Sequence, residues 1–219
     1  MDPLETIGET IRRVLEQKEQ ARNAAIEQSR ALIRDCANAI RAIHRKEWDL
    51  VEERLQKTNE AADALRAGVR AYPDLYFSGY TQDALKEYVE AFITRALVRD
   101  LPLPSPEELG VEPDTYLNGL AEAASELRRH ILDIIRHDEN TDEAERLLAC
   151  MDAIYALLMT FDLSDAVTGG LRRQTDQLRG VLERTRGDLT ITLRQQRLQE
   201  ALSRVERLAQ EADNGPPGR

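Results

Sequence analysis

The chain has 219 residues, of which 32% are charged and only 5% aromatic, and its formal net charge is -10. Strong helix formers dominate and typical strand residues are scarce, so we expect one all-α domain over residues 1–213 and exclude a β-rich fold. An acidic molecule is not drawn to nucleic acid as a whole, so any nucleic-acid contact must be local.

The sequence carries no recognisable targeting or membrane signal. Its amino terminus lacks a basic segment followed by an apolar one, and no window approaches about 18 uninterrupted apolar residues. The two cysteines, Cys36 and Cys150, lie far apart among apolar helical positions, which predicts reduced core residues and not a disulfide framework. We therefore expect a cytoplasmic protein without membrane partners.

Residues 4–44 are predicted to form one long amphipathic helix, or two in series, because apolar residues recur at spacings of three and four. Opposite the apolar residues of the second half lies a narrow row of basic residues, the arginine stripe: Arg30, Arg34, Arg41 and Arg45. Such a stripe can follow a phosphate backbone. Charged residues also form the ordinary solvated face of a helix, and the sequence leaves both interpretations open.

A second helix is predicted over residues 47–71. The connector that follows, residues 72–80, is rich in aromatic residues that could stack on unpaired bases or pack in a helix corner: Tyr72, Tyr76, Phe77 and Tyr80. The next helix, residues 81–99, carries Glu87 and Glu90. At a spacing of i,i+3 their carboxylates lie on one helical face, where they can share a divalent cation if a second pair faces them.

A proline-rich linker, residues 101–104, leads into a capping box. Ser105 is the predicted N-cap and Glu108 the third helical residue, and the short helix should end at Gly110.

Residues 113–136 are predicted to form a long helix that carries Glu122 and Glu126 away from its main apolar side. Gly119 lies one turn before Glu122 and would permit the close approach of another backbone.

Three further helices are predicted over residues 141–159, over residues 171–186, and from Gly187-Asp188 onward. Asn140 or Thr141 should cap the first of them, and the tail, residues 214–219, should be disordered. The chain then has about seven principal helices and no strand, with the short connections that are typical of helical bundles.

Other catalytic constellations are absent from the sequence. There is no glycine-rich phosphate loop, no cysteine or histidine cluster with zinc spacing and no nucleophile elbow. His44, His130 and His137 lie on different segments, and nothing in the sequence brings them together. What remains is carboxylate chemistry, most simply the binding of a hard cation such as Mg²⁺. Spacing alone is weak evidence, because with 40 acidic residues most i,i+3 pairs are solvated faces or structural ion pairs.

The carboxylate segments resemble the translin and translin-associated factor X family. The likeness covers roughly residues 22–190 and rests on four strings: Gly79-Tyr80, Leu85-Lys86-Glu87-Tyr88-Val89-Glu90-Ala91, Tyr116-Leu117-Asn118-Gly119-Leu120-Ala121-Glu122 and Ser125-Glu126-Leu127. Further matches are Ser29-Arg30 with His44-Arg45 at the family's separation, and residues 171–186 followed by Gly187-Asp188.

The resemblance implies a seven-helix bundle that assembles into a hollow homo-oligomer, typically an octamer. It also implies a magnesium-dependent endoribonuclease that cuts single-stranded RNA inside the assembly, with Mn²⁺ as an alternative ion. Translin has apolar residues where the factor X branch has Glu-x-x-Glu, so Glu87 and Glu90 imply the catalytic branch. The family pattern makes four glutamates the metal-binding and catalytic residues: Glu87, Glu90, Glu122 and Glu126. Glu122 stands where that branch has an aspartate.

In the same pattern Arg30 and Arg45 match family positions and would contact RNA, whereas Arg34 and Arg41 join them only by helical geometry. Two other functions remain open. One is a non-catalytic protein that binds single-stranded RNA or DNA, and the other is a structural oligomer in which the arginines and glutamates form salt bridges between subunits.

Overall fold

The computed structural model describes residues 3–137 and 141–213, and every regular element in those ranges is a helix, which confirms the all-α prediction. Six helices are long: α1 (Pro3–His44), α2 (Trp48–Val69), α4 (Gly79–Val98), α6 (Pro113–Arg136), α7 (Thr141–Leu158) and α9 (Leu171–Asp213). Three are single turns: α3 (Pro73–Tyr76), α5 (Pro106–Leu109) and α8 (Asp165–Thr168). The predicted Asn140 cap and the predicted disordered tail, residues 214–219, lie outside the described residues.

Within these two ranges, no helix combines the length and the apolar composition that crossing a membrane requires.

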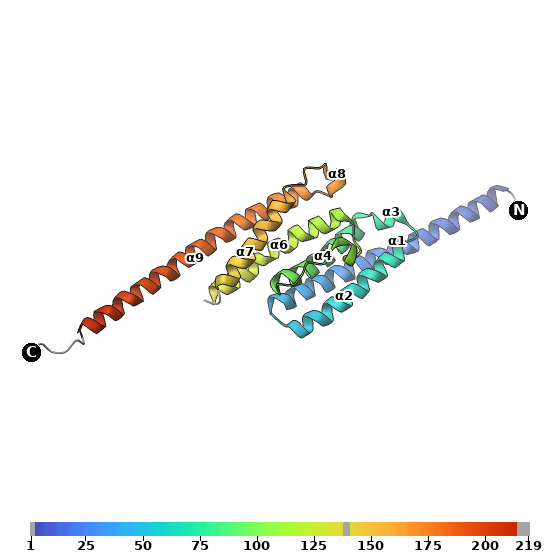
Figure 1. Ribbon diagram of the computed structural model, residues 1–219. Coiled ribbons are helices and arrows are strands. Elements are labelled where there is room, and N and C mark those ends of the chain that lie inside the picture. The colour runs from blue at the N-terminus through green and yellow to red at the C-terminus, as the bar shows by residue number, and fades with distance from the viewer. Residues whose placement is uncertain (1–2, 138–140, 214–219) are drawn as a thin grey trace, which may run out of the picture.

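The long helices lie side by side in a simple order. A tight turn at Lys46, whose φ of 58° is left-handed, joins α1 to α2, and these two helices pack together. α4 packs against α1 and also contacts α2. α6 packs against α4, and α7 and α9 both pack against α6 (Figure 1). α4 therefore lies between α1 and α6, and this arrangement determines where the predicted glutamates of α4 and α6 lie.

Burial of α4 extends around most of its circumference, because helices cover it on both sides. Tyr88, Val89, Ala91 and Ile93 are each at most 1% exposed. A helix that is apolar on nearly every face belongs inside a bundle. Glu90, in the middle of this segment, is only 8% exposed.

Several predicted features of the elements are confirmed. Residues 3–44 form one uninterrupted helix. The capping box at α5 is present, since Ser105 Oγ accepts a hydrogen bond from the Glu108 backbone N–H at 3.2 Å and Glu108 Oε2 accepts one from the Ser105 N–H at 2.8 Å. Gly110 ends α5 with a left-handed φ of 63°.

The predicted break at Gly187 is wrong, because α9 continues through it. Gly187 is not among the described glycines with positive φ, and the residues on either side of it bind the same partner on α6. Arg128 donates to Thr185 Oγ1 at 3.1 Å and to Asp188 Oδ2 at 2.8 Å. These contacts offset the cost of about 1 kcal/mol for a glycine inside a helix. The two helices predicted on either side of Gly187 are therefore one helix, α9, in the part of the chain that the structure describes.

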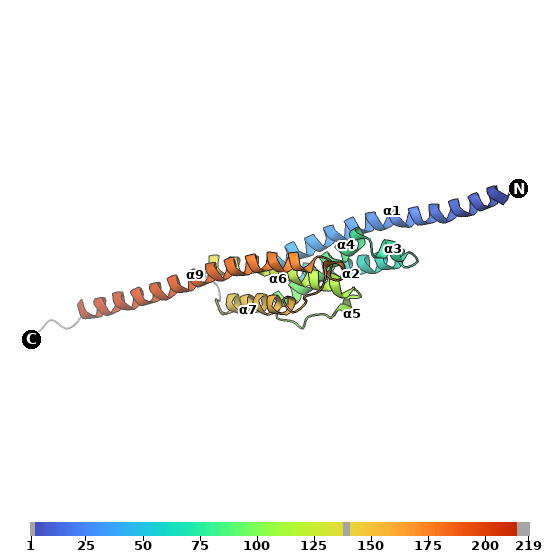
Figure 2. The same cartoon turned by 90° about the horizontal axis from the view of Figure 1, so that it is seen from above.

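Both ends of the chain extend away from the bundle. The first part of α1 and the last part of α9 project in opposite directions (Figures 1 and 2). We call these segments, residues 3–20 and 191–210, the N-terminal arm and the C-terminal arm. Each carries apolar side chains that are more than half exposed: Leu4, Ile7, Ile11, Val14 and Leu15 on one, and Ile191, Leu198, Leu202, Val205 and Leu208 on the other.

Candidate metal centre

Three of the four predicted glutamates converge between α4 and α6. Glu87, Glu90 and Glu122 each offer a carboxylate oxygen, and these three oxygens lie within 4.8 Å of one another. We call this group the three-carboxylate cluster. Glu87 and Glu90 come from one face of α4, and Glu122 faces them from α6, as the spacing predicted.

The close approach of α4 and α6 depends on Gly119. A Cβ at this position would lie 2.7 Å from the Val89 Cβ and 2.8 Å from the Lys86 carbonyl oxygen, closer than atoms tolerate. The absence of a side chain therefore lets the two backbones touch one turn before Glu122. The predicted role of this glycine is confirmed.

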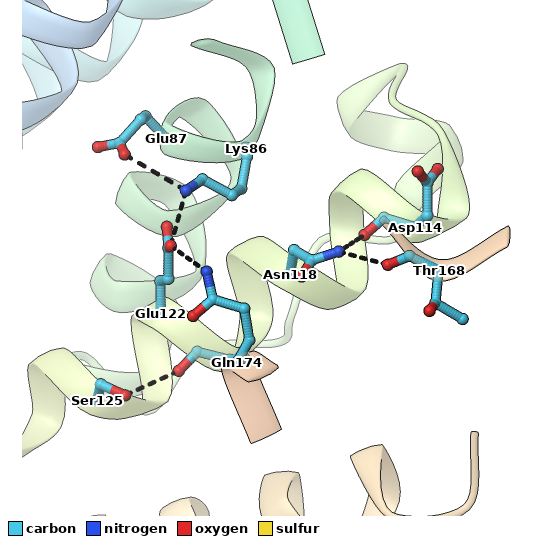
Figure 3. Close-up of polar contacts among 9 residues, drawn as sticks. Lys86, Glu87, Asp114, Asn118, Glu122, Ser125, Thr168 and Gln174 are labelled. Carbon is cyan, nitrogen blue, oxygen red and sulfur yellow. Dashed lines mark hydrogen bonds and ion pairs between the residues drawn. The ribbon is translucent and has the colours of Figure 1, made fainter. Parts of the chain in front are cut away.

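Hydrogen bonds from Asn118 and Gln174 position the start of α9 beside the cluster. Asn118 Nδ2 donates to the carbonyl oxygens of Asp114 and of Thr168, each at 2.8 Å, so α6 holds the single turn α8 (Figure 3). Gln174, in the first turns of α9, then donates from Nε2 to Glu122 Oε1 at 2.7 Å. α9 thus contributes directly to the surroundings of the cluster.

Burial and mutual repulsion disfavour the negative charges of the cluster. The pKa of Glu90 is raised to about 9, first by burial and then by the charges of Glu87 and Glu122. Burial followed by the charge of Glu122 also raises the pKa of Glu87. The same two α4 glutamates lie near the buried thiol of Cys36, whose pKa is raised mainly by burial. Both cysteines are free, and Cys36 is buried in the core as predicted, whereas Cys150 is only partly buried.

Lys86 supplies a positive charge at the edge of the cluster. Its Nζ donates to Glu122 Oε1 at 2.7 Å and lies 3.8 Å from Glu87 Oε1 (Figure 3). Burial works against the charge of this ammonium group, but the hydrogen bond and the charges of Glu122 and Glu87 outweigh it, so the pKa of Lys86 is raised. One ammonium group offsets only part of the charge of three carboxylates.

The donor set fits a hard divalent cation. Carboxylate oxygens are the ligands that Mg²⁺ and Mn²⁺ prefer. Two ligands on opposite sides of Mg²⁺ are about 4.2 Å apart, which is close to the 4.8 Å within which these oxygens lie. The pKa of Glu90 is raised by burial and by repulsion from its acidic neighbours, and a cation here would offset both effects.

Glu126, the fourth predicted ligand, lies outside the three-carboxylate cluster. His44, the last residue of α1, donates from Nε2 to Glu126 Oε2 at 2.6 Å. This hydrogen bond, against the opposing effect of burial, lowers the pKa of Glu126. Glu126 is nevertheless near enough to Glu90 to contribute to the raised pKa of that residue.

Two histidines from different helices, His44 and His130, lie close together in the structure. The rings of His44 and His130 lie 4.6 Å apart between centroids, and both side chains are almost fully buried. Burial and then the neighbouring His44 lower the pKa of His130 to about 4. Nothing in the sequence indicated this pair, because the end of α1 meets α6 only in the folded bundle.

A groove of about 580 Å³ runs beside the carboxylates, between α6 and α9. Glu90, Glu122 and Glu126 lie along it, with Gly180 and Arg184 on the α9 side. A Cβ on Gly180 would lie 3.5 Å from an Arg184 guanidinium nitrogen, so the arginine side chain folds back over the glycine. The groove therefore has an acidic wall on α4 and α6, and its α9 side carries two exposed side chains of opposite charge, Asp176 and Arg184.

The arginine stripe lies on the solvent side of α1, since Arg30, Arg34, Arg41 and Arg45 are all exposed. Arg41 donates to Asn38 Oδ1 at 2.6 Å. Within the described residues none of the four forms an ion pair with an acidic side chain. Their charges are therefore available to an external partner.

The aromatic connector is mostly packed against the core. Tyr72, Tyr76 and Tyr80 are partly buried, and Tyr76 donates to Glu112 Oε1 at 3.1 Å. Phe77 alone among the four is exposed. Of the two interpretations of this segment, packing in a helix corner applies to the three tyrosines.

Sequence reasoning missed the residues that surround the glutamates. Lys86 directly precedes Glu87, and a lysine beside an acid pair is a usable signal. His44 and Gln174 lie on α1 and α9, far from the glutamates in sequence, and only the family strings that contain or adjoin them could have drawn attention to them.

Known proteins place the chain in a family. No protein-family model matches it. An uncharacterized protein of Methanocaldococcus jannaschii is 35% identical over 195 residues, covering 88% of this chain and 85% of that protein. AfC3PO matches with a TM-score of 0.78 and 33% identity, over 84% of this chain and 95% of AfC3PO.

A structure of AfC3PO in complex with duplex RNA has a TM-score of 0.77 at the same identity and coverage. NeC3PO in its apo form, 21% identical, has a TM-score of 0.74 over 88% of this chain and 98% of NeC3PO, and supports the fold alone. Since a third of the matched residues are identical to AfC3PO along nearly all of its length, and the family strings form the carboxylate site, the chain belongs to the translin and translin-associated factor X family.

Proposed function

We propose that the protein is a metal-dependent endoribonuclease of the factor X branch that cuts single-stranded RNA. The observation that carries this proposal is the convergence of three carboxylate oxygens within 4.8 Å between α4 and α6. Glu87, Glu90 and Glu122 would hold Mg²⁺, or Mn²⁺ in its place. Glu122 offers the same oxygen chemistry as the aspartate of that branch, on a side chain one methylene longer.

A bound divalent cation supplies a Lewis acid that stabilises charge on a phosphodiester and makes a water molecule more acidic. Glu126 would orient such a water as a hydrogen-bond acceptor, because it lies along the same groove and the hydrogen bond from His44 lowers its pKa and keeps it ionised. His44 keeps the Glu126 carboxylate in place through the hydrogen bond to Oε2. Glu126 thus has a proposed catalytic role beside the three-carboxylate cluster and not within it.

RNA would be bound by positive charges around an otherwise acidic molecule. The arginine stripe on α1 and Arg184 at the groove are exposed guanidinium groups, which pair well with phosphate oxygens. The complex of AfC3PO with duplex RNA supports RNA as the ligand class. A preference for unpaired RNA follows from the family resemblance and is part of the proposal.

The protein would act as a hollow homo-oligomer, an octamer by family resemblance, in the cytoplasm. The exposed apolar residues of the N-terminal and C-terminal arms support assembly, because a stripe of this kind is normally buried against a partner helix.

The experiment is a cleavage assay on unpaired RNA with Mg²⁺, with and without chelator, on the wild type, Glu87→Gln and Glu90→Gln. We expect both variants to lose at least about 100-fold in rate, as removal of groups that act at the reacting centre usually does, while RNA binding and assembly persist. Glu53→Gln, at an exposed position on α2, is the matched control. Cleavage at the wild-type rate in both variants would contradict the proposal.

A second function is favoured by the contact of Lys86 with Glu122. An ammonium group in a carboxylate cluster is also what a purely structural ion-pair network would contain. In that case the protein would bind single-stranded RNA or DNA without cutting it. RNA binding with a steep salt dependence and no cleavage at any Mg²⁺ or Mn²⁺ concentration would establish this alternative.

A further inference from the structure

Lys86 and a divalent cation would require the same carboxylate. The Lys86 ammonium group lies 2.7 Å from Glu122 Oε1 and 3.8 Å from Glu87 Oε1, and Glu122 and Glu87 are two of the three residues that could hold a cation. Two positive charges at such short range repel strongly in a partly buried site, where water screens them poorly.

We propose that Lys86 sets the divalent-cation affinity of the three-carboxylate cluster by competing with the cation for Glu122. This inference rests on the metal-dependent function proposed above. Before the cation binds, Lys86 holds Glu122 near Glu87 and reduces the repulsion among the carboxylates. When the cation binds, the ammonium group leaves Glu122.

The surroundings of Glu122 allow this exchange without loss of the site. Gln174 also donates to Glu122 Oε1, at 2.7 Å, so the carboxylate stays oriented after Lys86 departs. Lysine has a flexible side chain of four methylenes. Asp83, one turn earlier on α4, is exposed and is near enough to attract Lys86, which gives the displaced ammonium group an alternative partner.

The competition would also select for the charge of the ion. A monovalent cation brings no more charge than the ammonium group it displaces, and it would lose the 2.7 Å hydrogen bond to Glu122. A divalent cation brings twice the charge and interacts with all three carboxylates. Lys86 therefore keeps Na⁺ and K⁺ out of the cluster and admits Mg²⁺ or Mn²⁺.

The test is calorimetric titration of the full-length protein with MnCl₂ at pH 7.5, for the wild type, Lys86→Met and Lys86→Gln. We expect both variants to bind Mn²⁺ about tenfold more tightly, since a nearby positive charge has been removed. We also expect their metal-free melting temperatures to fall and to recover when Mn²⁺ is added. Cleavage activity is not needed for either measurement.

Lys18→Met is the matched control. It changes the net charge by the same amount, but Lys18 pairs with Asp74 and does not contact the cluster. Wild-type affinity or weaker affinity in both Lys86 variants would overturn the competition and leave the metal site standing. No binding of Mn²⁺ by the wild type or the variants would refute the metal site and the competition together.

Discussion

At the scale of single residues, Glu90 links the site to the stability of the chain. Its pKa in the folded protein, about 9, lies above the ordinary value of 4.5, so the folded state holds a proton that the unfolded state releases. The stabilisation is fully present below about pH 4.5 and is lost as the pH rises through about 9. Without metal, the protein should become progressively less stable from pH 5 to pH 9.

Thermal melting in chelator across this pH range measures the effect on the wild type and on Glu90→Gln. The amide cannot ionise, so the variant should melt at a higher temperature than the wild type at pH 8.5, by about 2–4 °C for each kcal/mol gained. Glu53→Gln should keep the wild-type slope. Equal pH slopes for Glu90→Gln and the wild type would show that Glu90 carries no buried charge at high pH.

The sequence predicted the identity of the glutamates better than their environment. Spacing placed Glu87 and Glu90 on one face of α4, and the structure brings Glu122 opposite them. The sequence could not show that His44 holds Glu126, because that contact joins residues 82 positions apart. Local periodicity reports which face of a helix a residue occupies, and not which helix that face will meet.

At the scale of helices, Gly119 holds α4 and α6 at the distance that the cluster requires. Gly119→Ala would place a methyl group 2.7 Å from Val89 Cβ and force the helices apart. We expect a loss of about 1–3 kcal/mol, as overpacking of a core typically costs, together with weaker Mn²⁺ binding. Thermal melting and Mn²⁺ titration measure the two effects.

Gly187→Ala is the matched control, because a Cβ at this helical position would meet nothing within 4 Å. Alanine should be neutral there, or stabilise the helix by up to about 1 kcal/mol. Equal melting temperatures for the two alanine variants would mean that α4 and α6 tolerate the added methyl group.

Most helices were predictable from amphipathic spacing, and the differences have packing causes. α3 adds a helical turn inside the expected connector, where Leu75 is buried. The continuity of α9 depends on Arg128, which reaches across from α6 to Thr185 and Asp188. Glycine is common at the ends of helices, so the sequence alone predicts a break at Gly187. The contact between α6 and α9 explains why the helix continues instead.

At the scale of the whole molecule, the two arms expose apolar surface that the isolated chain does not cover. Leu198 and Leu202 on the C-terminal arm are 61% and 54% exposed and lie one turn apart. We expect Leu198→Glu with Leu202→Glu to shift the protein toward smaller species, because charges at a buried helix contact are costly. Light scattering coupled to gel filtration measures the change in mass.

Gln195→Glu with Gln199→Glu adds the same charge to the same arm without removing an apolar residue, and its mass should match the wild type. A wild-type mass for the leucine variant would show that the C-terminal arm is not an assembly surface.

Composition alone indicated a helical protein with a net charge of -10. It could not show which apolar stripes remain uncovered, since α2 and α6 have similar stripes that the bundle buries.

Because α9 is continuous, its length fixes the distance between the carboxylates and the end of the C-terminal arm. One helix carries Gln174 at the carboxylates and Leu208 near the end of the arm, a separation of about 50 Å at 1.5 Å per residue. A single residue inserted after the last contact with α6 would turn the apolar stripe of the arm by about 100° and leave the carboxylates unmoved. Seven inserted residues would restore the stripe to within about 20° of its original direction. The number of residues in α9 therefore sets both how far from the carboxylates the arm reaches and in which direction its apolar stripe faces.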